Sequence, residues 1–186
     1  MSMAQYMADV FRRAAVVDPD RLAEALTSAD RERTGTLLDV LSRAGVDETP
    51  LAQSLAAEMG VEFWHELPKT DQLPIPLLRD MGFDFSFARQ RGVIPVRELE
   101  GGALQVAQAN PLDTVALDDL RMVLTREVEP VAATPTAVLD AINRAQAEIN
   151  RTNELKSQGQ HEVSDERADI LESDEDAQII RWVNSL

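Results

Sequence analysis

The sequence predicts an α+β protein, in which a small helical bundle (residues 1–60) precedes a compact, sandwich-like α/β domain with a short sheet and helices (residues 61–149). Apolar residues recur at spacings of three and four in the first part, as on one face of a helix. In the second part, two strand-like runs, the second of alternating polarity, flank a Gly-Gly pair, which is typical of a hairpin. Apolar periodicity then stops, which predicts an acidic flexible linker (residues 150–176) and the start of a further domain (residues 177–186).

Three amphipathic patterns predict the helices of the bundle. One begins at Asp18–Pro19, and another has Thr49–Pro50 as N-cap and first helical residue and ends at Gly60. The apolar faces are Leu22, Ala25 and Leu26 in the first pattern, Leu37, Leu38 and Leu41 in the second, and Leu51, Leu55 and Met59 in the third. These faces are expected to form the core of the bundle.

The hairpin is predicted from residues 93–98 and 103–108, which surround Gly101 and Gly102. Pro95 lacks a backbone donor, so the first of these strands is expected at a sheet edge or at a bulge.

Two helices and a third strand are predicted after the hairpin. Asn110–Pro111 is expected to cap the first helix, residues 128–133 form the strand, and Thr134–Pro135 caps the last helix. The expected inward faces are Leu112, Ala116, Leu120 and Val123 in the first helix, and Val138, Ile142, Ala145 and Ile149 in the second.

Composition and charge exclude several classes of function. The 186 residues include 18 Lys+Arg and 33 Asp+Glu, which gives a net charge of −15. That charge repels phosphate backbones and anionic lipids, so neither nucleic-acid binding nor direct membrane insertion is expected. Cysteine is absent and only two histidines occur, which removes disulfides, thiol nucleophiles and Cys-based zinc sites. No apolar run approaches the length of a membrane span, so we expect a soluble cytoplasmic protein.

The chain carries no motif of an enzyme, such as a phosphate loop, a dinucleotide-binding fingerprint or a zinc-protease helix. No catalytic residue and no metal site is therefore predicted. The acidic run Asp174–Asp176 could attract a hard cation, but a solvated linker is the favoured interpretation. His65 could contact a ligand, although a packed junction between the two parts of the chain is favoured.

Aromatic and basic side chains form one more candidate cluster. Phe83, Phe85 and Phe87 alternate and could stack on bases, but core packing is favoured in so acidic a chain. Arg89 and Arg91 follow them and are interpreted as a solvated edge.

An ordered series of segments resembles a known family. It comprises the runs LPIPLLR (73–79), FARQRGVIPV (87–96), LQVAQANPLD (104–113), ALDDLR (116–121) and the helix from Thr134 to Ile142. This series is similar to the amino-terminal region of type II secretion ATPases, the E component of the general secretory pathway, and to pilus relatives. The ending DEDAQIIRWVNSL is similar to the start of that family's next domain, so we expect the chain to stop before the nucleotide-binding core.

The resemblance implies a function. In these systems the amino-terminal domain docks on the cytoplasmic domain of an L-type inner-membrane protein. The whole protein is expected to be a hexameric ATPase that uses ATP and Mg²⁺ at the cytoplasmic face of the inner membrane. This chain, without the core, is expected to have no enzymatic activity and no cofactor. Type II secretion is favoured over a pilus system.

Relatives of the same domain suggest an alternative, which is binding of cyclic di-GMP. Their motif has the form RLGxxLxxxG…LxxxLxxQ, and the nearest candidates here are Arg33, Gly35, Leu38 and Gly45. The match departs from the motif in three ways: Thr34 replaces leucine, the spacing between the glycines is too long, and Glu58 replaces glutamine. A carboxylate would repel a dianionic ligand, so ordinary core leucines at a helix start are the favoured interpretation.

Overall fold

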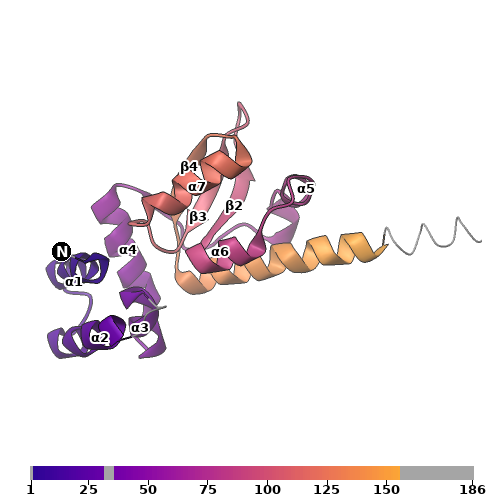
Figure 1. The fold of residues 1–186 in the computed structure, drawn as a ribbon. Helices are drawn as coiled ribbons and strands as arrows, with labels where there is room; N and C mark the ends of the chain where they lie inside the picture. The colour runs from indigo at the N-terminus through magenta and orange to yellow at the C-terminus, as the bar shows by residue number, and fades with distance from the viewer. Residues whose placement is uncertain (1, 32–35, 156–186) are drawn as a thin grey trace, which may run out of the picture. The chain divides into compact units, whose positions relative to one another are not determined.

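The computed structural model describes residues 2–31 and 36–155 (Figure 1). The described residues up to Gln146 form one compact unit, and those from Ala147 onward belong to a second. The predicted boundary at residue 60 therefore lies inside one compact unit. Helices and a four-stranded sheet are both present, which confirms the α+β prediction.

Four helices form the amino-terminal bundle: α1 (Met3–Ala14), α2 (Pro19–Arg31), α3 (Leu37–Arg43) and α4 (Glu48–Met59). The Ser2 hydroxyl accepts from Gln5 N, and the Gln5 side chain accepts from Ser2 N, which satisfies two backbone donors at the start of α1. The residues buried in the bundle core are Met7, Ala8, Val10, Phe11, Leu22, Ala25, Leu37, Leu38, Leu41, Leu51 and Leu55, joined by Leu112.

The third predicted helix differs from α4 at its start. Thr49 was expected as the N-cap, but Asp47 caps α4 by accepting from Thr49 N at 2.9 Å, because its carboxylate reaches a free backbone donor two residues on. Met59 is 38% exposed and lies outside the core, whereas Gly60 ends the helix as predicted with φ 64°.

The sheet has the order β1-β4-β3-β2, with β1 (Glu62–Phe63), β2 (Val93–Glu98), β3 (Leu104–Gln108) and β4 (Val128–Ala132). β2 and β3 form the predicted antiparallel hairpin. β2 lies at the edge, and its register shifts between Pro95 and Arg97, so both expectations drawn from this proline are confirmed. β4 is parallel to β3 and to β1, and β1 was not predicted.

The remaining helices surround the sheet. A 3-10 turn (Thr70–Gln72), α5 (Ile75–Asp80) and α6 (Phe85–Arg91) connect β1 to β2, and α7 (Thr114–Leu124) connects β3 to β4. A last helix begins at residue 135, with Thr134 Oγ1 accepting from Ala137 N as predicted, and it is described to residue 155. Residues 150–155 are therefore helical where a linker was expected, while residues 156–186 lie outside the described part.

The expectations for α7 need two corrections. Asn110 does not cap it: the Asn110 side chain accepts from Leu112 N in a turn, and Asp113 caps the helix by accepting from Ala116 N. The inward face is Ala116, Leu117, Leu120 and Leu124. With this helical phase, Val123 points outward, and Leu112 precedes the helix and joins the bundle core.

No helix in residues 2–31 and 36–155 is both long enough and apolar enough to cross a membrane.

Candidate functional site

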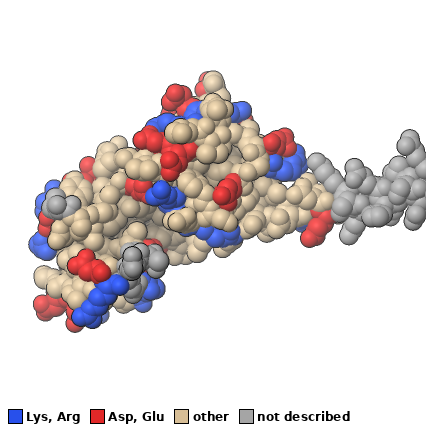
Figure 2. All heavy atoms as spheres, viewed as in Figure 1, with Lys and Arg blue, Asp and Glu red and all other residues tan. Residues whose placement is uncertain are grey.

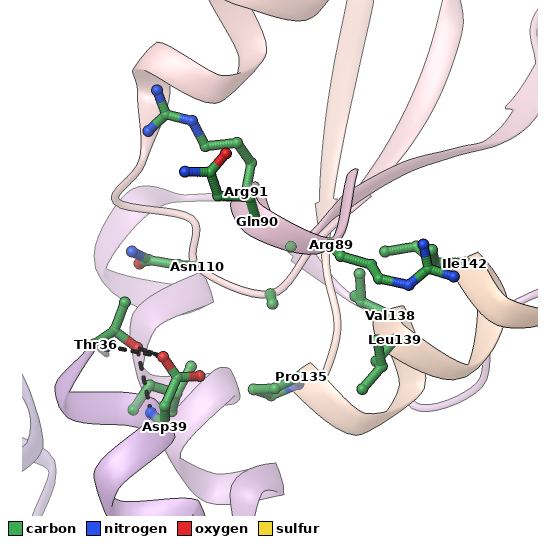
Figure 3. Close-up of a pocket in the computed structure, with 13 residues that line it drawn as sticks. Thr36, Asp39, Arg89, Gln90, Arg91, Asn110, Pro135, Val138, Leu139 and Ile142 are labelled. Atoms are coloured by element: carbon green, nitrogen blue, oxygen red, sulfur yellow. Dashed lines mark hydrogen bonds between the residues drawn. The ribbon is translucent and has the colours of Figure 1, made fainter. Parts of the chain in front are cut away.

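A cavity of about 180 Å³ lies between the amino-terminal helices and the sheet part of the first unit (Figure 3). Segments far apart in sequence line it: the start of α3, the end of α6, the loop after β3 and the start of the last helix. Its lining residues are Thr36, Leu38, Asp39, Arg89, Gln90, Arg91, Gly92, Ala109, Asn110, Pro135, Val138, Leu139 and Ile142. The cavity thus combines apolar side chains with two guanidinium groups.

The two arginines come from the last turn of α6 and diverge, with Arg89 extending toward Ile142 and Arg91 away from it (Figure 3). Arg89 donates to Asn143 Oδ1 at 3.2 Å and to Gln146 Oε1. Sequence reasoning interpreted both arginines as a solvated edge and missed that the fold brings them to a cavity.

Arg91 is held by two carboxylates that do not line the cavity. Its guanidinium lies 3.4 Å from Asp113 and 3.5 Å from Asp119. Both arginines therefore already have partners within the protein, and an anionic ligand would have to compete with them.

The four residues proposed for a cyclic dinucleotide do not all meet in this cavity. Leu38 lines it, and Gly45, which turns the chain between α3 and α4 with φ 77°, is not among the lining residues. Arg33 and Gly35 lie outside the described residues, so their predicted role stays a prediction.

Glu58, which stands where the nucleotide motif has glutamine, forms hydrogen bonds with two side chains of α1. Its Oε1 accepts from the Tyr6 hydroxyl at 2.6 Å and from Arg13 Nη2 at 2.9 Å. These donors stabilise the carboxylate and lower the pKa of Glu58, the Tyr6 hydrogen bond being the largest cause. The side chain thus joins α4 to α1, a contact with no signal in the sequence.

A second carboxylate joins the bundle to the start of the last helix. Glu48, the first residue of α4, accepts from Thr136 N and from Thr136 Oγ1, both at 3.0 Å, and from the Ser42 hydroxyl. It therefore satisfies a backbone donor at a helix start, where negative charge is favourable.

The remaining candidates are His65, the phenylalanine cluster and the acidic run. His65 lies two residues after β1, 3.4 Å from Gln53 of α4 and edge-on to Phe63, but it is exposed rather than buried. Phe83 is buried and meets Phe85 at 87°, a T-shaped pair rather than a flat platform for bases. Among the described residues, no group of acidic residues and histidines could hold a metal, and Asp174–Asp176 lie outside them.

The outer face of α7 exposes large apolar side chains. Val115 is 55% exposed, Met122 78% and Val123 71%. We call these three residues the α7 stripe. Val115 and Met122 are seven residues apart, so they lie on one line along the helix.

Comparisons with known proteins agree with this fold. The family model described as "MshEN domain" matches residues 59–151. The type IV pilus assembly ATPase PilB of Thermus thermophilus is 31% identical over 155 residues, which cover 79% of this chain. The chain spans 17% of the length of that relative.

Two solved structures share the fold. The N-terminal domain of XpsE has a TM-score of 0.57 at 22% identity and covers 77% of this chain and 96% of its own. A structure described as "MshE with cdg" has a TM-score of 0.54 at 21% identity and covers 75% of this chain and 97% of its own. Because the family match covers half of the 186 residues, the chain belongs to the MshEN domain family, and its likeness to the amino-terminal region of secretion and pilus ATPases is confirmed.

Proposed function

We propose that this chain is the docking domain of a type II secretion ATPase, and that it binds the cytoplasmic domain of the L-type inner-membrane protein. The observation that carries the proposal is the MshEN match, which spans the sheet and its surrounding helices. The whole protein would be a hexamer that uses ATP and Mg²⁺, and this part would supply recruitment rather than catalysis.

Charge supports recruitment through a protein. A chain with a net charge of −15 has little affinity for an anionic membrane surface, so a protein receptor is the physically favourable route to the inner membrane. A contact of ordinary size would bury about 800 Å² on each partner. The domain would then be cytoplasmic and peripheral to the membrane.

A calorimetric titration tests the proposal. The 186-residue chain is titrated with the purified cytoplasmic domain of the L-type protein from the same organism. We expect saturable binding with a Kd of about 1 μM or lower, equivalent to roughly −8 kcal/mol. The absence of binding by a chain that is folded by circular dichroism would overturn the proposal.

The cavity favours a second candidate, which is binding of cyclic di-GMP. Leu38 of the degenerate motif lies in the same cavity as Arg89 and Arg91, and guanidinium groups are suited to phosphate. Three features weigh against it. The cavity of about 180 Å³ is small for a dinucleotide, and both arginines have protein partners. Glu58 stands where the motif has glutamine, and its carboxylate is bound by side chains of α1.

Titration with cyclic di-GMP tests this second candidate. Binding that is lost in Arg91→Ala would support a site in the cavity, and binding that is lost in Arg33→Ala would support the role predicted for the sequence motif. Arg126→Ala is a suitable control, because Arg126 pairs with Glu98 near the hairpin turn and does not line the cavity. If the unmodified chain gives no heat with the nucleotide, this candidate is removed and docking stands alone.

A further inference from the structure

We infer that the α7 stripe is the docking surface, and that it receives a protein segment whose apolar side chains are flanked by lysine or arginine. The inference rests on the proposed docking function and assigns that function to a surface.

The stripe is unusual among the exposed apolar residues of the described chain. The other large ones do not cluster: Met3 is on α1, Met59 ends α4, and Leu139 and Leu155 lie more than four turns apart on the last helix. On α7, three such residues occur within nine positions on a helix of 11 residues. Met122 and Val123 leave more than two thirds of their surface in water, a cost that binding would remove.

The charges beside the stripe define its partner. Asp118 and Asp119 lie between Val115 and Met122 in the helix, one toward each side of the line that joins them. The Asp118 side chain is 67% exposed and that of Asp119 is 40% exposed. Figure 2 shows red carboxylates among the tan surface on the face that carries α7 in Figure 1.

The arginines that pair with these carboxylates are tied to other parts of the fold. Arg121 also donates to the Val128 carbonyl oxygen of β4 at 3.3 Å, and Arg91 also contacts Asp113. Both aspartate side chains nevertheless keep exposed surface that a partner can reach. Cationic side chains on that partner would complement them and would increase the rate of encounter.

The helix is held in place, so little order has to be gained on binding. Asp113 caps it, and the buried Gln108 side chain donates to the Asp113 carbonyl oxygen at 2.7 Å. Leu120 and Leu124 fix its inner face. A rigid helix with an exposed apolar line is a common way to present a binding surface.

Titration of substituted chains with the L-type cytoplasmic domain tests the assignment. Met122→Asp is expected to raise the Kd at least about tenfold, because a carboxylate would be buried against apolar groups. Met3→Asp places the same charge at a half-exposed methionine of α1 and is expected to change the Kd less than about twofold. Both positions are exposed, and thermal melts followed by circular dichroism verify that both variants fold.

Charge neutralisation tests the chemistry of the partner. Asp118→Asn is expected to weaken binding several-fold and to reduce its salt dependence. Asp140→Asn is the matched control, because Asp140 is 63% exposed and pairs with an arginine one turn further along its own helix, as Asp118 does, but that helix is not α7.

The outcomes separate the surface from the function. If the unmodified chain binds and Met122→Asp binds equally well, the assignment to α7 is wrong and docking uses another surface. If Met122→Asp weakens binding but Asp118→Asn does not, the α7 stripe is the docking surface, but the proposal that the partner carries cationic side chains is wrong. If the unmodified, folded chain does not bind, the docking function fails, and the surface assignment fails with it.

Discussion

At the residue scale, Gly92 shows how a single side-chain atom can matter at the cavity wall. Gly92 ends α6 with φ 62°, and a Cβ added there would lie 3.0 Å from the Cβ of Ala109. Gly60 ends α4 with φ 64°, and nothing lies within 4 Å of its Cβ position. The two glycines share a backbone conformation and differ in their surroundings.

Substituting both glycines separates strain from crowding. Gly60→Ala is expected to lower the free energy of unfolding by about 1 kcal/mol through the left-handed conformation. Gly92→Ala is expected to lower it by about 1 kcal/mol more, because Ala109 must shift. Urea denaturation measures both values. Equal decreases in the free energy of unfolding would mean that Ala109 can shift without a measurable energetic cost.

The Glu58 carboxylate predicts a pH dependence of stability. Its pKa is lowered in the folded chain, so it contributes stability above its ordinary pKa of 4.5 and loses that contribution as the pH falls through the lower folded value. The melting temperature is expected to fall less between about pH 7 and about pH 3 in Glu58→Gln than in the unmodified chain.

Two variants make the Glu58 experiment specific. Tyr6→Phe removes the largest cause of the pKa shift and should also flatten the profile. Glu24→Gln, at an exposed position of α2, should leave the profile unchanged. Parallel profiles for Glu58→Gln and the unmodified chain would contradict the assignment of the shift to this cluster.

At the scale of elements, the sequence patterns predicted three bundle helices, the hairpin, α7, β4 and the last helix, but not α1, α5, α6 or β1. Three helices of the bundle follow from apolar residues that repeat every three to four positions, because burial of one helix face is visible in the sequence. The hairpin follows from the Gly101-Gly102 turn between two strand-like runs, although β2 is buried on both faces over its first four residues. The prolines were also informative: Pro19 starts α2 and Pro95 lies in the edge strand. These signals come from residues close together in the chain, so they can be recognised in a single sequence.

Features that depend on distant partners could not be predicted in this way. β1 has only two residues, and it is a strand because it pairs with β4. The cap of α7 depended on whether Asn110 or Asp113 reached a free donor, and both residues are good caps in sequence. Arg89 and Arg91 became cavity residues only because α3 and the last helix lie opposite them.

The contact between α4 and the last helix gives a prediction at this scale. Glu48→Ala removes the acceptor for Thr136 N and is expected to cost about 1 kcal/mol, as for the loss of a helix cap. The amides at the start of the last helix should then exchange faster with deuterium. Glu100→Ala, at an exposed residue of the hairpin loop, is the control, and faster exchange in both variants would show a general rather than a local effect.

At the scale of the whole molecule, Leu112 joins the two predicted parts of the chain. It belongs to the loop between β3 and α7, yet its side chain is buried in the core of the helical bundle. A boundary near residue 60 was expected from the change of pattern along the sequence. Because Leu112 packs into the bundle core from the loop before α7, we predict instead that the bundle and the sheet unfold together.

Native-state hydrogen exchange can measure this coupling. The amides of Leu55 in α4 and Val106 in β3, both fully buried, are expected to open with the same free energy. Leu112→Ala, which empties part of the shared core, should lower both values by about 2 kcal/mol, and Val123→Ala on the exposed face of α7 should change neither. A loss confined to Leu55 would mean that the bundle opens alone. In that case residues 1–60 would unfold as a separate domain, as the sequence pattern predicts.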